Sequence, residues 1–202
     1  MLFRSNLSYG IDANLRPTSA LILNAYYAGS QAEGTTSDGY TTRLSASYRD
    51  AFWNTGVMWK RVSEDFDPGI GFVRRQDMDQ AYATIGVHAR PRWRGIQEVA
   101  PYLELDHIAD LRGQLDTRSV QAGLDLLFQP DGNLKFIVTD QFDRLDEPFT
   151  VVTGHSVPIG AYGWREAEVS YTSGRSRRVY GTATLTSGGF YDGSKQIGRA
   201  HV

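Results

Sequence analysis

Residues 40–49 read YTTRLSASYR. Mostly apolar side chains alternate in this stretch with side chains that are all polar or charged. Because successive side chains of a β-strand point to opposite faces, this period of two predicts a strand with one apolar and one polar face. Residues 53–62, WNTGVMWKRV, repeat the pattern, so the two stretches predict a hairpin that turns at Asp50. The first face carries Tyr40, Thr42, Leu44, Ala46, Tyr48, Trp53, Thr55, Val57, Trp59 and Arg61.

Aromatic residues lie near both ends of the apolar face of this hairpin, at Tyr40 and Tyr48 and again at Trp53 and Trp59. Strands of transmembrane β-barrels run for about 10 residues, alternate apolar and polar side chains, and carry aromatic girdles at both membrane interfaces. Strands of soluble β-sandwiches also alternate, so the hairpin alone leaves both folds open.

The rest of the chain extends the same pattern to about ten strands, with connections that alternate between short and long. Transmembrane barrels have short turns at one end and longer loops at the other. The sequence therefore predicts an all-β protein, part of an antiparallel up-and-down transmembrane β-barrel. The expected strands are 3–13, 19–29, 40–49, 53–62, 80–90, 97–107, 118–128, 134–142, 161–171 and 179–187, with short connections near Pro17, Asp50, Arg92, Asp131 and Gly174 and longer ones near Glu33, Pro68, Leu111, His155 and Tyr191.

Many residues on the predicted polar faces are charged. The packed core of a soluble protein does not tolerate so many charges, because each would lose its hydration. A water-filled lumen keeps them solvated and is therefore the favoured interpretation. These residues are Arg43, Lys60, Glu104, Asp106, Asp125, Glu166 and Glu168.

The composition excludes several other classes. The 202 residues carry a net charge of -2, which offers no basic face for nucleic acid, and they include no cysteine for a disulfide or a thiolate metal site. No apolar run is long enough for a transmembrane helix. An exported barrel needs a leader, and residues 1–4 lead straight into an alternating strand, so we expect the natural chain to begin upstream.

Residues 196–202, QIGRAHV, resemble the in-frame translation of a common sequencing adapter, which encodes the last six of them. We therefore expect them to be artefactual, and residues 1–195 to form part of a single barrel domain.

Residues 63–75, SEDFDPGIGFVRR, resemble the signature of an uncharacterised bacterial family, the domain of unknown function 5916. Residues 145–149, 157–162 and 188–193 resemble later segments of that family, in the same order along most of residues 1–195. Its members join an amino-terminal sandwich, similar to a family 9 carbohydrate-binding module, to a carboxy-terminal outer-membrane barrel. The family has no established activity. The resemblance implies a barrel in the bacterial outer membrane, linked to carbohydrate handling by an upstream domain absent from this chain.

The same segment contributes candidate binding residues, namely Asp65, Asp67, Arg74 and Arg75. The two aspartates with Gly69 resemble a calcium loop, but the full ligand spacing is missing, so no metal is predicted.

The favoured interpretation of this segment is structural. Pro68, Gly69 and Gly71 shape a bend, Phe72 anchors it, and the two arginines pair with acids of the lumen.

Two pairs of carboxylates provide further binding candidates: Glu104 with Asp106, and Glu166 with Glu168. Members of each pair are two residues apart and so share a face. Glycosidases use two carboxylates at a set separation, but channel linings also carry acids, and the lining is the favoured reading. Stacking on sugars and packing within the barrel both remain open for Tyr102, Tyr162 and Trp164.

A nucleophilic hydrolase site would need serine, histidine and an acid together. Asp106 and His107 are adjacent and should point to opposite faces, and Ser156 lacks a nucleophile elbow. His88 and His155 are the other candidate histidines for such a site. We assign no catalytic residue, metal or cofactor.

The sequence thus favours a non-enzymatic outer-membrane barrel of a Gram-negative envelope, acting as a pore or a membrane anchor. Its expected partners are outer-membrane lipid and an oligo- or polysaccharide. The alternatives are an outer-membrane hydrolase with its active site at the rim, a soluble β-barrel or sandwich that binds a ligand, and an active transporter with a plug domain upstream.

Overall fold

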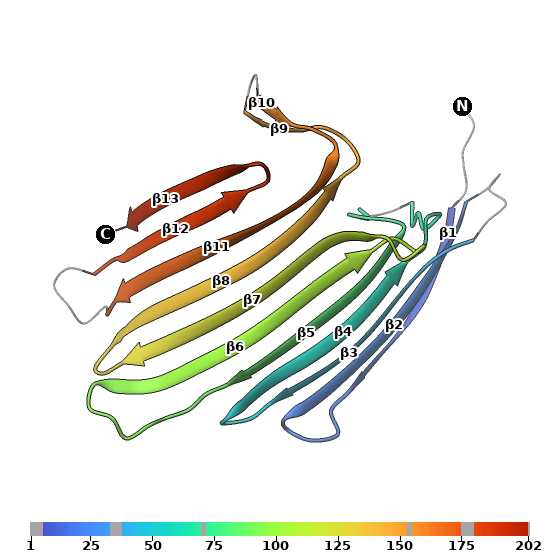
Figure 1. Ribbon diagram of the computed structural model, residues 1–202. Coiled ribbons are helices and arrows are strands. Elements are labelled where there is room, and N and C mark those ends of the chain that lie inside the picture. The colour runs from blue at the N-terminus through green and yellow to red at the C-terminus, as the bar shows by residue number, and fades with distance from the viewer. Residues whose placement is uncertain (1–5, 33–37, 70–71, 153–154, 175–179, 202) are drawn as a thin grey trace.

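The computed structural model describes residues 6–32, 38–69, 72–152, 155–174 and 180–201, and all of its regular structure is β (Figure 1). None of the described residues forms a helix long and apolar enough to cross a membrane. The strands are β1 (Asn6–Leu15), β2 (Leu21–Ala32), β3 (Gly39–Arg49), β4 (Trp53–Val62), β5 (Met78–Val87), β6 (Ile96–Ala109), β7 (Leu115–Phe128), β8 (Gly132–Leu145), β9 (Phe149–Val152), β10 (His155–Val157), β11 (Gly160–Ser173), β12 (Thr182–Phe190) and β13 (Gly193–His201).

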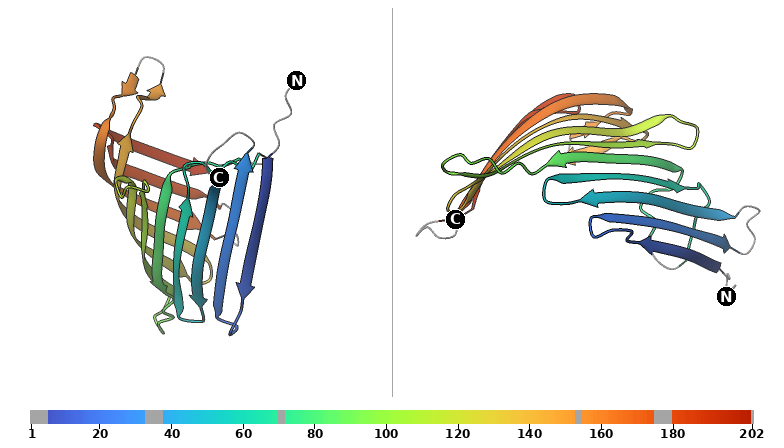
Figure 2. Two further views of the ribbon diagram at one scale, coloured as in Figure 1. Left: turned by 90° about the vertical axis from the view of Figure 1, so that its right-hand side faces the viewer. Right: turned by 90° about the horizontal axis from the view of Figure 1, so that it is seen from below.

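Eleven strands form one antiparallel sheet in the order β1-β2-β3-β4-β5-β6-β7-β8-β11-β12-β13. This up-and-down order confirms the all-β antiparallel prediction. Figure 2 shows that the sheet curves but does not close, because β1 and β13 form its two free edges. The short strands β9 and β10 pair with each other in a separate sheet, within the stretch predicted to be a long loop.

The predicted alternation of short and long connections is confirmed only in part. Residues 50–52 and 129–131 are short turns, and the connections 63–77 and 146–159 are long. The prediction is wrong at β5–β6, where the connection 88–95 is longer than the 110–114 connection that follows β6. It is also wrong at β12–β13, where two residues, Tyr191 and Asp192, reverse the chain.

That tight reversal brings residues 193–201 alongside β12, where a loop and an artefactual tail were expected. Every residue from Gly193 to His201 has a register partner on β12, from Phe190 to Thr182. Backbone pairing accounts for this strand, because it depends little on side-chain type.

The two predicted faces are continuous across the sheet. Directly paired residues share a face, so the registers trace rows across it. One apolar row runs through Leu23, Ala46, Val57, Ala83, Leu105 and Val120. One polar row runs through Thr84, Glu104, Gln121, Thr139 and Glu166.

Burial on these faces is the reverse of that in a soluble core. Val57 is 58% exposed, Leu103 55% and Val138 54%, whereas Trp164 and Glu166 on the polar face are partly buried. Side chains crowd together on the concave side of a curved sheet and splay apart on the convex side. The polar face is therefore the inner side of the curve in Figure 2.

The turn between β3 and β4 is held by one carboxylate. Asp50 Oδ1 accepts the backbone N–H groups of Phe52 (2.8 Å) and Trp53 (2.6 Å), and the Tyr48 hydroxyl donates to its Oδ2 (2.8 Å). The bonds from Trp53 and Phe52 lower the pKa of Asp50. The ionised carboxylate therefore stabilises the turn above its ordinary pKa of 3.8, and this contribution is lost as pH falls through the lowered value.

We expect Asp50→Ala to lower the urea midpoint of unfolding at pH 7, because two backbone donors lose their acceptor. Asp50→Asn should keep most of the stability, since its amide oxygen still accepts them. The difference in urea midpoint between wild type and Asp50→Ala should become smaller below pH 3.8. Tryptophan fluorescence measures the midpoints, and an unchanged midpoint in Asp50→Ala would contradict this role.

Candidate functional site

The polar face is hollowed where β7, β8 and β11 meet the turn between β12 and β13. The pocket has a volume of about 330 Å³. Its lining combines aromatic rings with charged and hydroxyl side chains, so it presents both apolar and polar surface to a ligand. Among the lining residues are Thr117, Asp143, Phe149, Trp164, Glu166, Tyr191 and Lys195.

Tyr191 is the centre of the aromatic wall of this pocket. Its ring lies 4.8 Å from Trp164, 5.7 Å from Phe149 and 5.4 Å from Tyr162, measured between centroids. Phe190 meets it edge-on at 5.0 Å. Tyr191 has a φ of 52°, in the left-handed region that a two-residue hairpin turn requires. The reversal of the chain thus places this ring over the polar face.

A hydrogen-bonded chain runs behind the rings. The Tyr191 hydroxyl donates to Asp143 Oδ2 (2.7 Å), and Thr117 Oγ1 donates to Asp143 Oδ1 (3.1 Å). Arg75 Nη1 in turn donates to Thr117 Oγ1 (3.4 Å). Burial, with the hydrogen bond to Asp143, raises the pKa of Tyr191 to about 12. Tyr191 therefore remains a protonated donor at neutral pH and fixes the orientation of the carboxylate.

An ion pair closes the other side of the pocket. Lys195 on β13 pairs with Glu166 on β11, and its Nζ lies 5.4 Å from the centroid of the Phe190 ring. Rings beside carboxylates and an amine suit a ligand with apolar ring faces and many hydroxyl groups, because the rings stack while the charged groups accept and donate hydrogen bonds.

The two predicted acidic pairs lie on the polar face, each on its own strand. Glu104 and Glu166 share a row, yet β7 and β8 lie between their strands, which separates them by about 14 Å at the strand spacing of a sheet. Asp106 accepts a hydrogen bond from Gln80 (2.7 Å) and Glu168 one from Thr186 (3.1 Å). The two pairs therefore line the face at separate positions.

A second polar pocket of about 330 Å³ surrounds Glu104. Gln121 donates to the Tyr102 hydroxyl (2.8 Å), and Lys135 pairs with Asp125 at 3.7 Å. This pocket holds both charge signs but lacks the aromatic cluster around Tyr191.

Of the four candidates in the connection between β4 and β5, only Arg75 approaches the aromatic pocket, where it also pairs with Asp116 at 3.4 Å. Asp65, Asp67 and Arg74 are exposed. Asp67 Oδ1 accepts the Gly69 N–H (3.0 Å), and within the described residues no three histidine or acidic side chains group as metal ligands. Gly71, expected to shape the bend, lies outside the described residues.

The predicted anchor of this connection is wrong. Phe72 is 88% exposed, whereas Phe66 is 7% exposed and packs with Val62 and Met78. Gln76 Nε2 donates to the Phe66 carbonyl (2.7 Å), and the Asp67 N–H donates to Ser30 Oγ (2.9 Å). Asn6 Nδ2 of β1 donates to the Asp67 carbonyl (2.9 Å), and the Tyr40 N–H of β3 donates to Ser63 Oγ (2.8 Å). Residues 63–69 are thereby held across the inner side of β1, β2 and β3.

The histidines do not form a hydrolytic site in the described part of the chain. Asp106 pairs with Tyr82 on the polar face and His107 with Ala81 on the apolar face, which confirms their predicted opposite directions. His88 Nδ1 lies 2.7 Å from Glu98 Oε1, and no described hydrogen bond joins a histidine to a serine. The side chain of His155 lies outside the described residues.

Sequence reasoning named Trp164 and Tyr162 but missed Asp143, Phe149, Tyr191 and Lys195 as their partners. The adjacent aromatic residues Phe190 and Tyr191, flanked by glycines, were the available signal. The chain matches no family model, no curated protein and no solved structure.

Proposed function

We propose that this chain forms the wall of an outer-membrane β-barrel in a Gram-negative envelope, and acts as a pore or as the anchor of a carbohydrate-handling domain. One observation carries the proposal. The sheet exposes many of its large apolar side chains on the convex face and partly buries most of its charged side chains on the concave face. Among the described residues, no second sheet covers the apolar face. Lipid is the solvent that such a face fits.

Grooves lined by apolar side chains on this face also support contact with lipid. Two shallow grooves of about 600 and 720 Å³ share Ala46, Val57, Ala83 and Leu105 in their linings. Contiguous exposed apolar surface of this kind marks membrane or protein contacts. In hydrocarbon the free backbone groups of β1 and β13 need partners, so the proposal requires the sheet to close, directly or through further strands.

The mechanism would be passive. The concave face carries both charge signs, including Lys135 with Asp125 and Lys195 with Glu166, which suits a hydrated lumen. Residues 63–69, held across the inner side of β1 to β3, would narrow that lumen. What passes would be selected by size and charge.

Two measurements on the full-length protein test the proposal. In isolated outer membranes it should migrate differently on a gel with and without boiling, because closed barrels resist the detergent until heated. Liposome swelling in small sugars then separates a pore, which admits them, from an anchor, which does not. Recovery in the soluble fraction without a mobility shift would contradict the membrane location.

A saccharide is the ligand that the aromatic pocket favours. We expect Trp164→Ala to weaken oligosaccharide binding about 3- to 10-fold, the effect of losing one aromatic contact, and Trp164→Phe to keep most of the affinity. Trp93→Ala is the matched control, because Trp93 is 63% exposed and lies in the β5–β6 connection. A glycan panel measures retention, and failure of every glycan to bind would refute this ligand class.

A further inference from the structure

The apolar face carries a few charged side chains, and their distribution is uneven. Among the described strand residues of this face, every charged side chain lies in the half of its strand nearer the β4–β5, β6–β7 and β8–β11 connections. The opposite half carries none. The set comprises Arg61, Asp79, Arg118, Asp140, Arg144 and Arg165.

Three of these residues, on β7, β8 and β11, form one cluster. Arg118 Nη2 lies 2.9 Å from Asp140 Oδ1, and Arg165 Nε lies 2.8 Å from Asp140 Oδ2. Two guanidinium groups thus share one carboxylate, which leaves the cluster positively charged. The Arg165 side chain is 81% exposed and that of Arg118 41%. The described contacts of Arg165 engage only its Nε, so its remaining N–H donors face outward.

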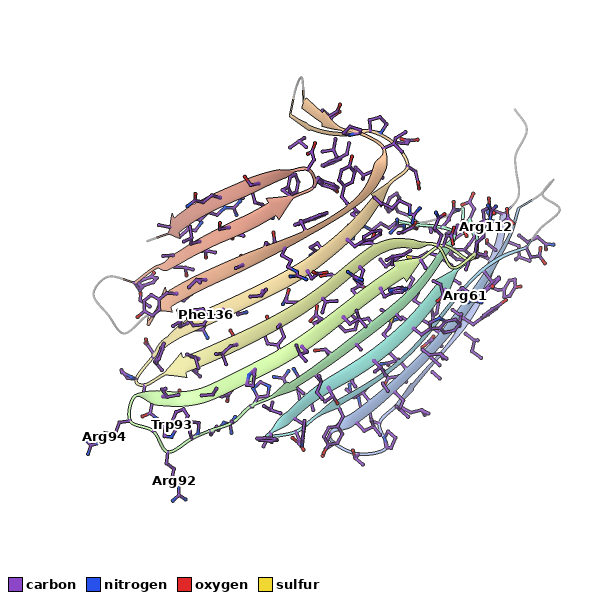
Figure 3. All side chains as sticks on the ribbon, in the orientation of Figure 1. Arg61, Arg92, Trp93, Arg94, Arg112 and Phe136 are labelled. Atoms are coloured by element: carbon purple, nitrogen blue, oxygen red, sulfur yellow. The ribbon has the colours of Figure 1, made fainter. Side chains whose placement is uncertain are left out.

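Apolar side chains continue directly from this cluster along the same three strands. Asp140 pairs with Val120 across β7 and β8, and the next row holds Ala122, Val138 and Ala167. Beyond it comes Phe136, which Figure 3 labels on β8. A ligand that fits this surface carries an anionic group beside a long apolar tail.

From this juxtaposition we infer that Arg118 and Arg165 bind the phosphate of an anionic membrane lipid whose acyl chains lie along Val138, Ala167 and Phe136. Arginine binds phosphate through two parallel N–H donors, and Asp140 holds the two guanidinium groups in position for it. A zwitterionic lipid fits less well, because its cationic part finds no free acid in this cluster. The inference rests on the proposed membrane location.

Native mass spectrometry of the full-length protein in detergent tests this site, with lipid A as a doubly phosphorylated probe. The double variant Arg118→Ala/Arg165→Ala should bind lipid A at least about tenfold more weakly. The control is Arg92→Ala/Arg94→Ala, which removes the same charge from the β5–β6 connection, at the other end of the sheet (Figure 3). It should leave binding unchanged.

Asp140→Asn separates phosphate binding from a structural role. Its amide oxygen can still accept from a guanidinium group, but the negative charge that repels phosphate is removed, so lipid A binding should be kept or strengthened. If the charge of Asp140 served only to hold the three strands together, lipid A binding should weaken. Equal binding by wild type and the double arginine variant would overturn the inference, as would competition by inorganic phosphate at the concentration of the lipid. A boiling-dependent gel shift on the same samples shows whether the barrel is intact, so loss of the shift would count against the proposed function instead.

Discussion

We expect Val57→Arg to lower the free energy of unfolding in lipid bilayers by about 2–4 kcal/mol, the cost of arginine near the middle of a lipid-facing strand. Val57 lies in the middle of β4 and is 58% exposed. Its cross-strand neighbours Ala46 and Ala83 are small, so an arginine meets no steric barrier. The loss of unfolding free energy therefore shows whether lipid or water covers the apolar face. In water, an exposed position of this kind tolerates arginine within about 0.5 kcal/mol.

Met58→Arg is the matched control for this substitution. Met58 is the next residue on β4, and its side chain lies on the polar face between Ser45 and Tyr82. A hydrated lumen accepts the charge, so we expect a loss of less than about 1 kcal/mol. Urea unfolding in vesicles, followed by tryptophan fluorescence, compares the two variants. Equal losses at the two positions would contradict the assignment of lipid to one face and water to the other.

Phe66→Ala is expected to cost about 3 kcal/mol, at the lower end of the range for truncating a buried phenylalanine, because its cluster is small. The side chain is 7% exposed and packs on Val62 and Met78. Without it, residues 63–69 should detach from the concave face. Limited proteolysis should then cleave this connection faster, and a pore-forming protein should admit sugars faster in liposome swelling.

Phe72→Ala provides the control within the same connection. Phe72 is 88% exposed, so its truncation should change stability by no more than about 0.5 kcal/mol and leave the proteolysis rate unaltered. If Phe72→Ala were as damaging as Phe66→Ala, the packing described for this connection would be wrong.

The strands and their two faces could be predicted because both follow from local periodicity. Leu44 and Val57 alternate with Arg43 and Met58 whatever the rest of the chain does, and the registers keep them on opposite faces. Strand pairing between neighbours followed from the same pattern. The lengths of the β5–β6 and β6–β7 connections could not be predicted from this pattern. In the β5–β6 connection, Ala89 pairs with Val99 in an isolated bridge, which depends on where the two strands meet in space.

The aromatic pocket could not be assembled from sequence for a related reason. Asp143, Trp164 and Tyr191 come from three separate elements, and only the registers bring them together. The sequence also could not show whether Phe66 or Phe72 anchors the β4–β5 connection. Both lie in the same polar connection, and only contact with Met78, beyond its far end, distinguishes them. For Glu104 and Glu166, the sequence predicted the face on which they lie, but it could not predict that two strands separate them.

A scan of single cysteines along β4 tests the central claim most directly, because the chain contains no natural cysteine. Each position from 53 to 62 would carry a fluorophore in vesicles that contain nitroxide-labelled lipid. We predict strong quenching by lipid at the odd-numbered positions, Val57 above all, and weak quenching at the even-numbered positions such as Met58. Uniform quenching, or none at any position, would contradict a sheet with one face in lipid and the other in water.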